Sequence, residues 1–182
     1  IEDDGISVVQ KTNYPYDGEI RIKASGLEKV YLRIPGWCEN FDLNKAYAMK
    51  NGYAVVENDG TEIVLNLVIK PVLIEANPNV IADSGKAAVM RGPIVYCAES
   101  ADNIENLHSL YLSKELNAKE SYSEFFRAYT IEVDGYRLKG FDGLYQKLNR
   151  EYEKCRIKLI PYYGFANRGE SNMSVWLNFK DE

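Results

Sequence analysis

Glu19-Ile-Arg-Ile-Lys-Ala-Ser25 alternates apolar and charged side chains, and Lys29-Val-Tyr-Leu-Arg33 repeats this alternation after a break at Ser25-Gly26. Successive side chains of a β-strand point to opposite faces, so a period of two indicates a half-buried strand. The break between the two stretches contains turn residues, and Pro15-Tyr-Asp-Gly18 precedes the first stretch in the same way. The pattern predicts two strands of an antiparallel sheet, joined as a hairpin or as part of a meander.

Strand and turn signals continue along the chain. Asn51-Gly52 is a favoured two-residue hairpin turn, and the stretch 61–69 is apolar on both faces, which predicts a strand in the middle of a sheet. Gly92-Pro93 interrupts a strand expected over 86–98, where proline removes a ladder donor, and we expect a bulge or a bend there. Later strands are predicted over 129–133, where Asp134-Gly135 ends the strand, 156–160 and 173–179, with a short helix near 113–119.

The predicted architecture is all-β with little helix. No helical pattern is long enough to cover a sheet, whereas short strands and Gly, Asn and Asp turns are frequent along the 182 residues. We therefore expect two small antiparallel β-sandwich domains of the jelly-roll type, at residues 1–98 and 99–182. The alternative in which the last strand returns to the first sandwich stays open.

Composition excludes several classes of partner. The net charge is −5 and Lys and Arg form no run, so the electrostatic footprint of a nucleic-acid binder is missing. No apolar run approaches the ~18–20 residues that a bilayer requires, and the start of the chain lacks both Met and the pattern of a signal peptide. We predict no nucleic-acid or membrane partner, and a chain taken from a longer protein.

Three cysteines, Cys38, Cys97 and Cys155, are too few and too far apart for a disulfide scaffold. Their odd number leaves at least one thiol free, and buried reduced thiols are the ordinary state of such residues. This slightly favours a cytoplasmic protein and leaves a periplasmic or secreted parent open.

Four phrases together resemble the C-terminal half of glycoside hydrolase family 127, the β-L-arabinofuranosidase family. They are Thr12-Asn-Tyr-Pro-Tyr-Asp-Gly18, Leu32-Arg-Ile-Pro-Gly-Trp37, Arg91-Gly-Pro-Ile-Val-Tyr-Cys97 and Ile160-Pro-Tyr-Tyr-Gly-Phe-Ala-Asn-Arg168. The resemblance extends over nearly the whole chain. Cys38 and Gly164-Phe165 depart from the family pattern, which leaves the substrate open rather than the fold.

The resemblance implies a longer protein whose N-terminal (α/α)6 barrel performs the chemistry. In that family the proposed nucleophile is a zinc-bound cysteine thiolate, with a glutamate as acid/base, and all of these residues belong to the barrel. None of those motifs matches this chain, so we assign it no catalytic residue, no metal ligand and no cofactor, and expect zinc in the barrel. The expected partner is that barrel, and a homodimer of the parent or of the fragment stays open.

Two groups of residues merit comparison with simpler interpretations. Cys97, Glu99 and His108 could form a thiol or zinc site, but ligands in paired local spacings are missing, and a core thiol beside a surface carboxylate is the simpler interpretation. Arg91 could clamp a ligand carboxylate, although a local pairing is simpler, and Asn167-Arg168-Gly169 has the composition of a locally bonded turn.

Aromatic residues suggest where a ligand could bind. The chain has 14 Tyr, 2 Trp and 6 Phe, and such rings stack on sugars in many β-sandwiches. We select Trp37, Tyr162 and Tyr163 as candidate carbohydrate-binding residues, against the alternative that they pack in a core or a domain interface. The leading hypothesis is therefore a non-catalytic accessory region that supports the barrel, and the second is a carbohydrate-binding module.

Overall fold

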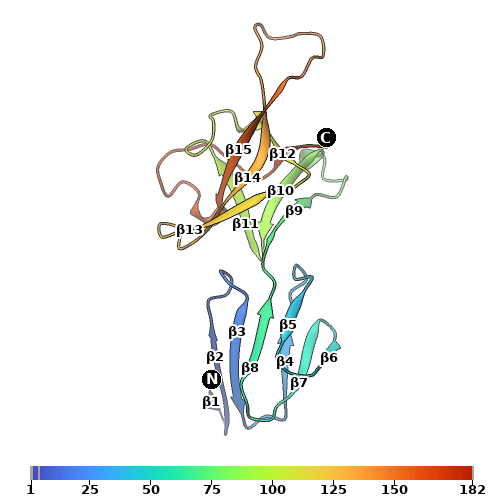
Figure 1. Cartoon of the computed structure of the whole chain (residues 1–182), viewed down its shortest axis with the longest axis vertical. Coiled ribbons are helices and arrows are strands. Elements are labelled where there is room, and N and C mark those ends of the chain that lie inside the picture. Colours follow the sequence, from blue (N-terminus) through green and yellow to red (C-terminus); the bar gives the residue numbers. More distant parts are fainter. Residues whose placement is uncertain (1, 4, 182) are drawn as a thin grey trace. The chain divides into compact units, whose positions relative to one another are not determined.

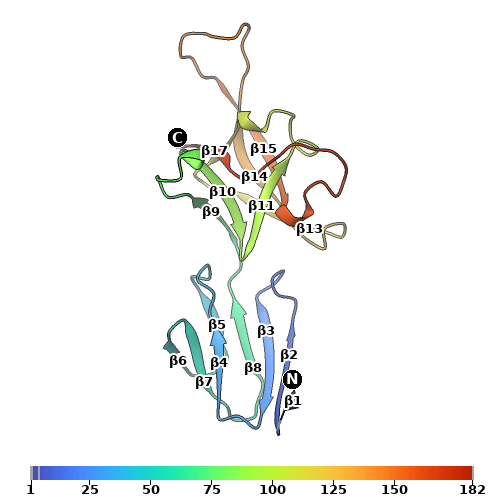
Figure 2. The same ribbon diagram turned by 180° about the vertical axis from the view of Figure 1, so that it is seen from behind.

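The computed structural model describes residues 2–3 and 5–181. The chain divides into two compact units, Ile1–Lys70 and Pro71–Glu182, which we call unit 1 and unit 2. Strands dominate both units, and the helices among the described residues are three single 3₁₀ turns (Figures 1 and 2). The all-β prediction is confirmed. In this described part of the chain, no helix is long and apolar enough to cross a membrane.

Unit 1 contains eight strands among the described residues. They are β1 (Glu2–Asp3), β2 (Ile6–Thr12), β3 (Glu19–Ser25), β4 (Lys29–Arg33), β5 (Phe41–Leu43), β6 (Tyr47–Lys50), β7 (Tyr53–Glu57) and β8 (Ile63–Leu67). One sheet has the order β1-β2-β3-β8-β5 and the other the order β4-β7-β6. All their pairings are antiparallel.

The two sheets of unit 1 enclose one apolar core. Ile22 and Leu65 from the larger sheet cluster with Leu32 and Val56 from the smaller one, and each is almost fully buried. Side chains of the opposite faces remain exposed because the strands alternate, as the sequence predicted. Unit 1 is therefore a β-sandwich.

The local turn predictions for unit 1 were partly right. Asn51-Gly52 forms the predicted turn, since Lys50 pairs with Tyr53 and both turn residues have positive φ, 51° and 79°. Strand β8 lies between β3 and β5, as its two apolar faces predicted. The predicted hairpin or meander of β3 and β4 was wrong, because the chain crosses at Gly26 from one sheet to the other and their apolar faces meet across the core.

Unit 2 contains nine strands and three 3₁₀ turns within the described residues. The strands are β9 (Pro71–Glu75), β10 (Lys86–Arg91), β11 (Ile94–Glu99), β12 (Leu110–Ser113), β13 (Ala118–Ser123), β14 (Ala128–Leu138), β15 (Tyr152–Pro161), β16 (Met173–Ser174) and β17 (Leu177–Lys180). The turns are η1 (Ile81–Asp83), η2 (Leu107–Ser109) and η3 (Tyr162–Gly164).

The strands of unit 2 belong to a single hydrogen-bonded sheet. Its order runs β16-β11-β15-β14-β12-β17-β10-β9, β13 pairs with β14, and β10 also pairs with β11. Every ladder in the described part is antiparallel except that between β12 and β17. Strand β9 occupies one edge of β10, and β11 and β17 share its other edge, so unit 2 is an all-β unit with mainly antiparallel pairing, in agreement with the predicted fold class.

The division between the units also differs from the prediction. We expected it near Ala98, but strands β10 and β11 are hydrogen-bonded to β17 and β15 and so belong to unit 2. Gly92-Pro93 is a two-residue turn between β10 and β11, because Arg91 pairs with Ile94, and neither a bulge nor a bend between sheets. The last strand, β17, pairs with β10 and β12 inside unit 2.

Two further local predictions were wrong in unit 2. Asp134-Gly135 does not end a strand but lies within β14, where Gly135 is needed because a Cβ there would lie 2.6 Å from the Tyr111 carbonyl oxygen and from Ile157 Cδ1. The stretch 113–119 contains no helix, since strand pairing of its two ends overrides the local helix propensity.

Candidate functional site: an aromatic end of unit 2

Trp37 lies in unit 1 and packs against the core of the sandwich. It is half-buried, and its ring stacks on that of Tyr14 with a centroid distance of 6.4 Å and an interplanar angle of 18°. Trp37 and Tyr14 come from the first two motif phrases, so this stack joins the two phrases. The geometry is that of a packing residue more than of an open sugar platform.

Tyr162 and Tyr163 lie together in unit 2, on the 3₁₀ turn η3 that directly follows β15. They are 50% and 53% exposed, so both rings keep an accessible face. The Tyr163 hydroxyl reaches the Phe126 carbonyl oxygen at 3.5 Å. Gly164, the next residue, supports the Phe126 ring, since a Cβ there would lie 2.6 Å from Phe126 Cδ1.

More aromatic residues gather at the same end of unit 2, around the connection between β13 and β14. Phe125 is 61% exposed and meets the buried Phe126 edge to face at 4.9 Å, while Tyr122 meets Tyr129 at 5.6 Å. We call the group Tyr122, Phe125, Phe126, Tyr129, Tyr162 and Tyr163 the aromatic end of unit 2. Sequence reasoning missed four of these residues, because only the pairing of β13, β14 and β15 brings them near Tyr162 and Tyr163.

A buried ion pair holds the loop after η3 against strand β11. The Glu99 side chain, 1% exposed, pairs with Arg168 and accepts a hydrogen bond from the Ala166 backbone N–H at 2.9 Å. The Arg168 guanidinium also lies over the Phe126 ring, 5.2 Å from its centroid. The expected locally bonded turn is confirmed, since the Asn167 N–H donates to the Gly164 carbonyl oxygen at 3.4 Å and the Gly169 N–H to the Ala166 carbonyl oxygen at 3.3 Å. The Arg168 side chain adds contacts far along the chain. Glu99 is a buried carboxylate and not the surface one that we expected.

Asp102 and Lys158 extend this pair into a network. Asp102 accepts hydrogen bonds from Arg168 Nη1 at 3.0 Å and from Lys158 Nζ at 2.8 Å. Burial raises the pKa of Asp102, but the hydrogen bonds from Arg168 and then Lys158 outweigh it and leave that pKa below its ordinary value. The hydrogen bond to Asp102 raises the pKa of Arg168 in turn, so Asp102 and Arg168 form a charged pair at neutral pH.

Arg91 forms a second such contact at the same end. It is 7% exposed, pairs with Glu120 on β13, and lies 4.5 Å from the centroid of the Tyr129 ring. The Tyr96 hydroxyl donates a hydrogen bond to the Tyr129 carbonyl oxygen at 2.8 Å. The motif arginine therefore ties the β10–β11 turn to β13 and β14, through partners more distant in sequence than the local pairing that we expected.

Cys97, Glu99 and His108 differ widely in environment. Cys97 is fully buried, and burial, followed by the charge of Glu99, raises the pKa of its thiol to about 12. A thiol with that pKa stays protonated at neutral pH and is a poor nucleophile or metal ligand. His108 lies on η2, where its carbonyl oxygen accepts a hydrogen bond from Asn178. The described residues hold no cluster of three or more His, Cys, Asp or Glu suited to a metal ion.

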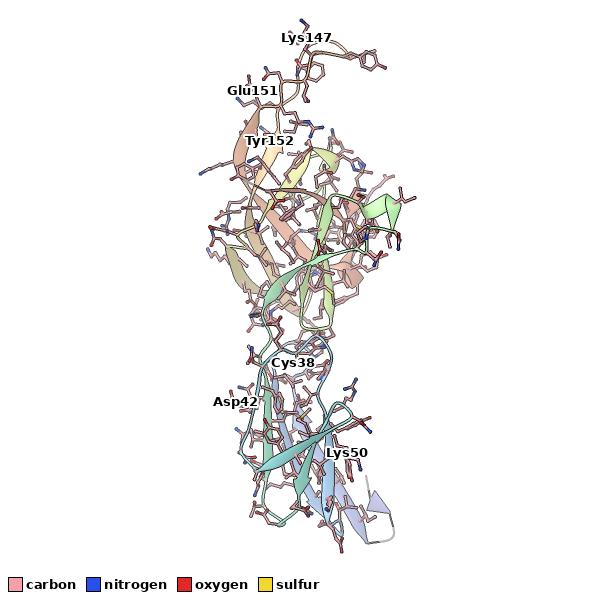
Figure 3. All side chains as sticks on the ribbon, turned by 90° about the vertical axis from the view of Figure 1, so that its right-hand side faces the viewer. Cys38, Asp42, Lys50, Lys147, Glu151 and Tyr152 are labelled. Atoms are coloured by element: carbon pink, nitrogen blue, oxygen red, sulfur yellow. The ribbon has the colours of Figure 1, made fainter. Side chains whose placement is uncertain are left out.

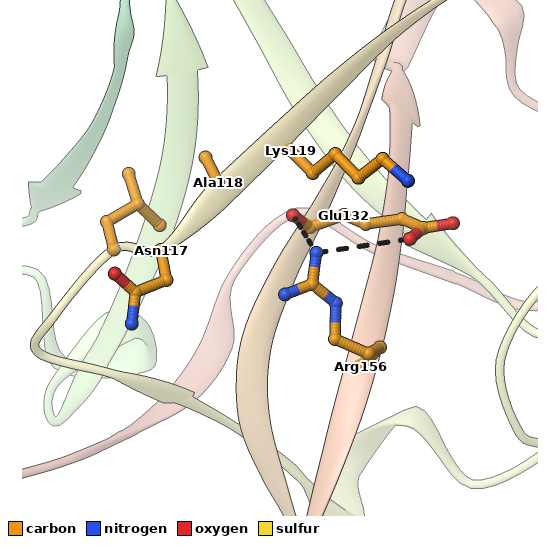
Figure 4. A pocket seen from close by; sticks show the side chains of 6 residues that line it. Asn117, Ala118, Lys119, Glu132 and Arg156 are labelled. Carbon is orange, nitrogen blue, oxygen red and sulfur yellow. Dashed lines mark hydrogen bonds and ion pairs between the residues drawn. The ribbon is translucent and has the colours of Figure 1, made fainter.

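An open polar hollow of about 640 Å³ lies on strands β13 to β15 (Figure 4). Arg156 crosses it, donating to Asp134 at 2.7 Å and to the Glu132 carbonyl oxygen at 3.0 Å, and Asn117 and Lys119 lie beside it. The hollow has no aromatic lining and its guanidinium is already paired. The aromatic end is therefore the stronger candidate site of unit 2.

Comparison with known proteins gives consistent matches. The model of the glycoside hydrolase family 127 C-terminal domain matches residues 71–178. A non-reducing end β-L-arabinofuranosidase of Bifidobacterium longum subsp. longum is 31% identical over 198 aligned residues, which cover 94% of this chain and 30% of the relative.

Solved structures agree with the sequence matches. A GH127 β-L-arabinofuranosidase from Geobacillus stearothermophilus T6 superposes with a TM-score of 0.86 and 34% identity, over 96% of this chain and 31% of that one. A second GH127 β-arabinofuranosidase gives a TM-score of 0.80 and 31% identity, over 96% and 32% of the two chains. The chain thus spans about a third of the length of these relatives.

Proposed function

Since the chain belongs to glycoside hydrolase family 127, we propose that it is the non-catalytic accessory region of a longer β-L-arabinofuranosidase-like enzyme. In this proposal the two β units pack on the catalytic barrel and stabilise it. The observation that carries the proposal is the aromatic end of unit 2, where Arg91 and Arg168 pair with carboxylates of the unit. Four of its rings are exposed by half or more, those of Tyr122, Phe125, Tyr162 and Tyr163. Half-exposed rings on a fixed backbone suit docking to another protein surface.

The chemistry of the chain's own residues supports a non-catalytic role. Glycoside hydrolysis needs an acid and a second nucleophilic or basic group across a sugar site. Glu99 is enclosed by Arg168 and the backbone of Ala166, and the Cys97 thiol has a pKa of about 12. Neither group can approach a glycosidic bond in this arrangement, and we place the zinc and the nucleophile of the family in the barrel of the parent.

The test is hydrolysis of p-nitrophenyl β-L-arabinofuranoside by this chain and by the full-length enzyme, with and without added zinc. We expect activity in the full-length enzyme and none in the chain under either condition. Hydrolysis by residues 1–182, abolished by Glu99→Gln, would overturn the proposal. As a control for folding, near-UV circular dichroism of the variant should match that of the unchanged chain.

A carbohydrate-binding module is the second candidate. Tyr162, Tyr163 and Phe125 each expose half or more of their surface at one end of unit 2, as a sugar platform requires. Titration of the ¹⁵N-labelled chain with arabino-oligosaccharides tests this idea. Resonance shifts limited to 122–129 and 160–168, and lost in a Tyr162→Ala/Tyr163→Ala variant, would favour binding. Unchanged spectra, or shifts that the variant retains, would remove this candidate.

A further inference from the structure

The loop of residues 139–151, which joins β14 to β15, extends beyond the other strands of unit 2 (Figure 1). Its base continues the β-hairpin: Leu138 pairs with Tyr152, and the Lys139 backbone N–H donates to the Glu151 carbonyl oxygen at 2.9 Å. A Lys139–Glu151 ion pair at 3.4 Å closes the same base. Lys147 lies at the far tip, well away from Tyr152 where the strand begins (Figure 3).

The tip of this loop exposes large apolar side chains. Leu144, Tyr145 and Leu148 are 88%, 94% and 87% exposed, and Phe141 is 48% exposed. Together they border a shallow notch of about 230 Å³. Single exposed apolar residues are ordinary, but four within eight positions of one loop form a patch of the kind that marks an interaction surface.

Among the described residues of unit 2, nothing explains these side chains as packing residues. Within the tip, Gln146 Nε2 donates a hydrogen bond to the Asn149 carbonyl oxygen at 2.9 Å. A Cβ added at Gly140 or Gly143 would meet no atom within 4 Å, so the backbone there is not pressed against the strands. The side chains therefore gain little from the fold of unit 2, and a partner is needed to bury them.

We propose that the loop 139–151 docks on the catalytic portion of the same full-length polypeptide, with Leu144, Tyr145 and Leu148 as its anchors. This inference rests on the proposed accessory function and names a second contact, separate from the aromatic end. The relatives supply the occupant: the chain matches 31% of the Geobacillus stearothermophilus enzyme, so most of that protein lies outside the match.

The size of the patch favours a partner on the same polypeptide. An aromatic ring buries ~150–250 Å², so the four side chains together offer several hundred Å². Stable complexes of separate chains bury about 800 Å² on each partner. Parts joined in one chain meet at effective concentrations in the millimolar range, so a smaller contact is sufficient there. A second copy of the chain is the less favoured occupant for the same reason.

Hydrogen–deuterium exchange compares this chain with the full-length enzyme. We expect peptides covering 140–150 to exchange at least ~10-fold more slowly in the full-length enzyme, because docking must open before exchange occurs. A triple variant, Leu144→Ser/Tyr145→Ser/Leu148→Ser, should lose this protection. The matched variant Asp142→Ser/Gln146→Ser/Asn149→Ser changes polar positions of the same loop and should retain it. Equal exchange in both proteins would overturn the inference.

Cross-linking from Lys147 identifies the occupant. The experiment uses a mixture of ¹⁴N- and ¹⁵N-labelled full-length enzyme. We expect the Lys147 amine to cross-link to residues outside 1–182, with both linked peptides carrying the same isotope label. Mixed-label cross-links would instead assign the loop to a second copy and overturn the proposal. If 160–168 are protected and the loop is not, only this inference fails; if neither is protected, the accessory function fails as well.

Discussion

The two units contain different family phrases, which play different structural roles. In unit 1 the first two phrases meet through a ring stack, Tyr14 on Trp37, at the edge of an apolar sandwich core. In unit 2 the other two phrases lie on paired strands, with Cys97 opposite Ile160, and Arg168 of the fourth phrase pairs with Glu99, two residues beyond the third phrase. The phrases of unit 1 therefore pack the fold, whereas in unit 2 the Glu99–Arg168 pair holds a surface loop next to exposed rings.

The strongest test of this difference is removal of the buried carboxylate of unit 2. Glu99→Ala leaves Arg168 with Asp102 alone and removes the acceptor of the Ala166 N–H. Breaking a buried pair costs ~3–5 kcal/mol, and we expect the lower value, about 3 kcal/mol, because Arg168 keeps a partner. Urea unfolding followed by hydrogen exchange should report this loss in unit 2. Glu151→Ala removes one partner of an exposed ion pair and should cost less than ~1 kcal/mol. An equal cost in both variants would contradict a stabilising role of the buried Glu99–Arg168 pair.

A matched test in unit 1 acts through backbone packing and not through charge. A Cβ on Gly18 would lie 1.8 Å from the Leu67 carbonyl oxygen, and the Gly18 carbonyl oxygen accepts the Leu67 N–H at 2.9 Å. Gly18→Ala must therefore displace β8, and we expect unit 1 to lose ~2–3 kcal/mol. Gly36→Ala, which meets no atom within 4 Å, should stay within ~0.5 kcal/mol. Hydrogen exchange of the backbone amides of unit 1 measures this loss. Amides that exchange as slowly in Gly18→Ala as in the unchanged chain would contradict the prediction.

Replacing one aromatic residue in each unit tests whether that residue packs the fold or lies at an exposed surface. Trp37 is half-buried against the core of unit 1, so Trp37→Ala should destabilise that unit by ~2 kcal/mol, less than a fully buried aromatic residue. Tyr162 is half-exposed, and Tyr162→Ala should cost unit 2 less than ~0.5 kcal/mol. Denaturant midpoints with unchanged m-values would measure both effects. A larger loss from Tyr162→Ala would make it a packing residue and weaken the docking proposal.

The sequence predicted features that depend on neighbouring residues. Asn51-Gly52 determines its turn by its own positive φ angles, and the apolar alternation of 19–25 determines which face is buried. It could not predict that β3 and β4 belong to different sheets, because either pairing satisfies the same alternation. Gly135 has the composition of a turn, and only the approach of Tyr111 and Ile157 explains its place within a strand.

The candidate site was predicted only in part for the same reason. Tyr162 and Tyr163 are adjacent in the sequence, so selecting one selects the other. Phe125 joins them through strand pairing over more than thirty residues, which no local pattern reveals. Alternation placed Glu99 on the face of Cys97, but a single sequence does not tell that this face is closed by Arg168, 69 residues further on.

Acid should lower the stability of unit 2 through protonation of Asp102, and this is the smallest effect that we predict. The folded pKa of Asp102 is lowered, so the folded state binds fewer protons than the unfolded chain between that pKa and the ordinary value of 3.8. Its contribution to stability is therefore complete well above pH 3.8 and is lost as the pH falls through the lowered folded pKa. Unit 2 of Asp102→Asn should show a shallower loss of urea midpoint from pH 5 to pH 3 than the unchanged chain. Asp142→Asn, on the exposed loop, is the control, and equal slopes in all three proteins would show that the Arg168–Asp102 contact does not couple protonation to folding.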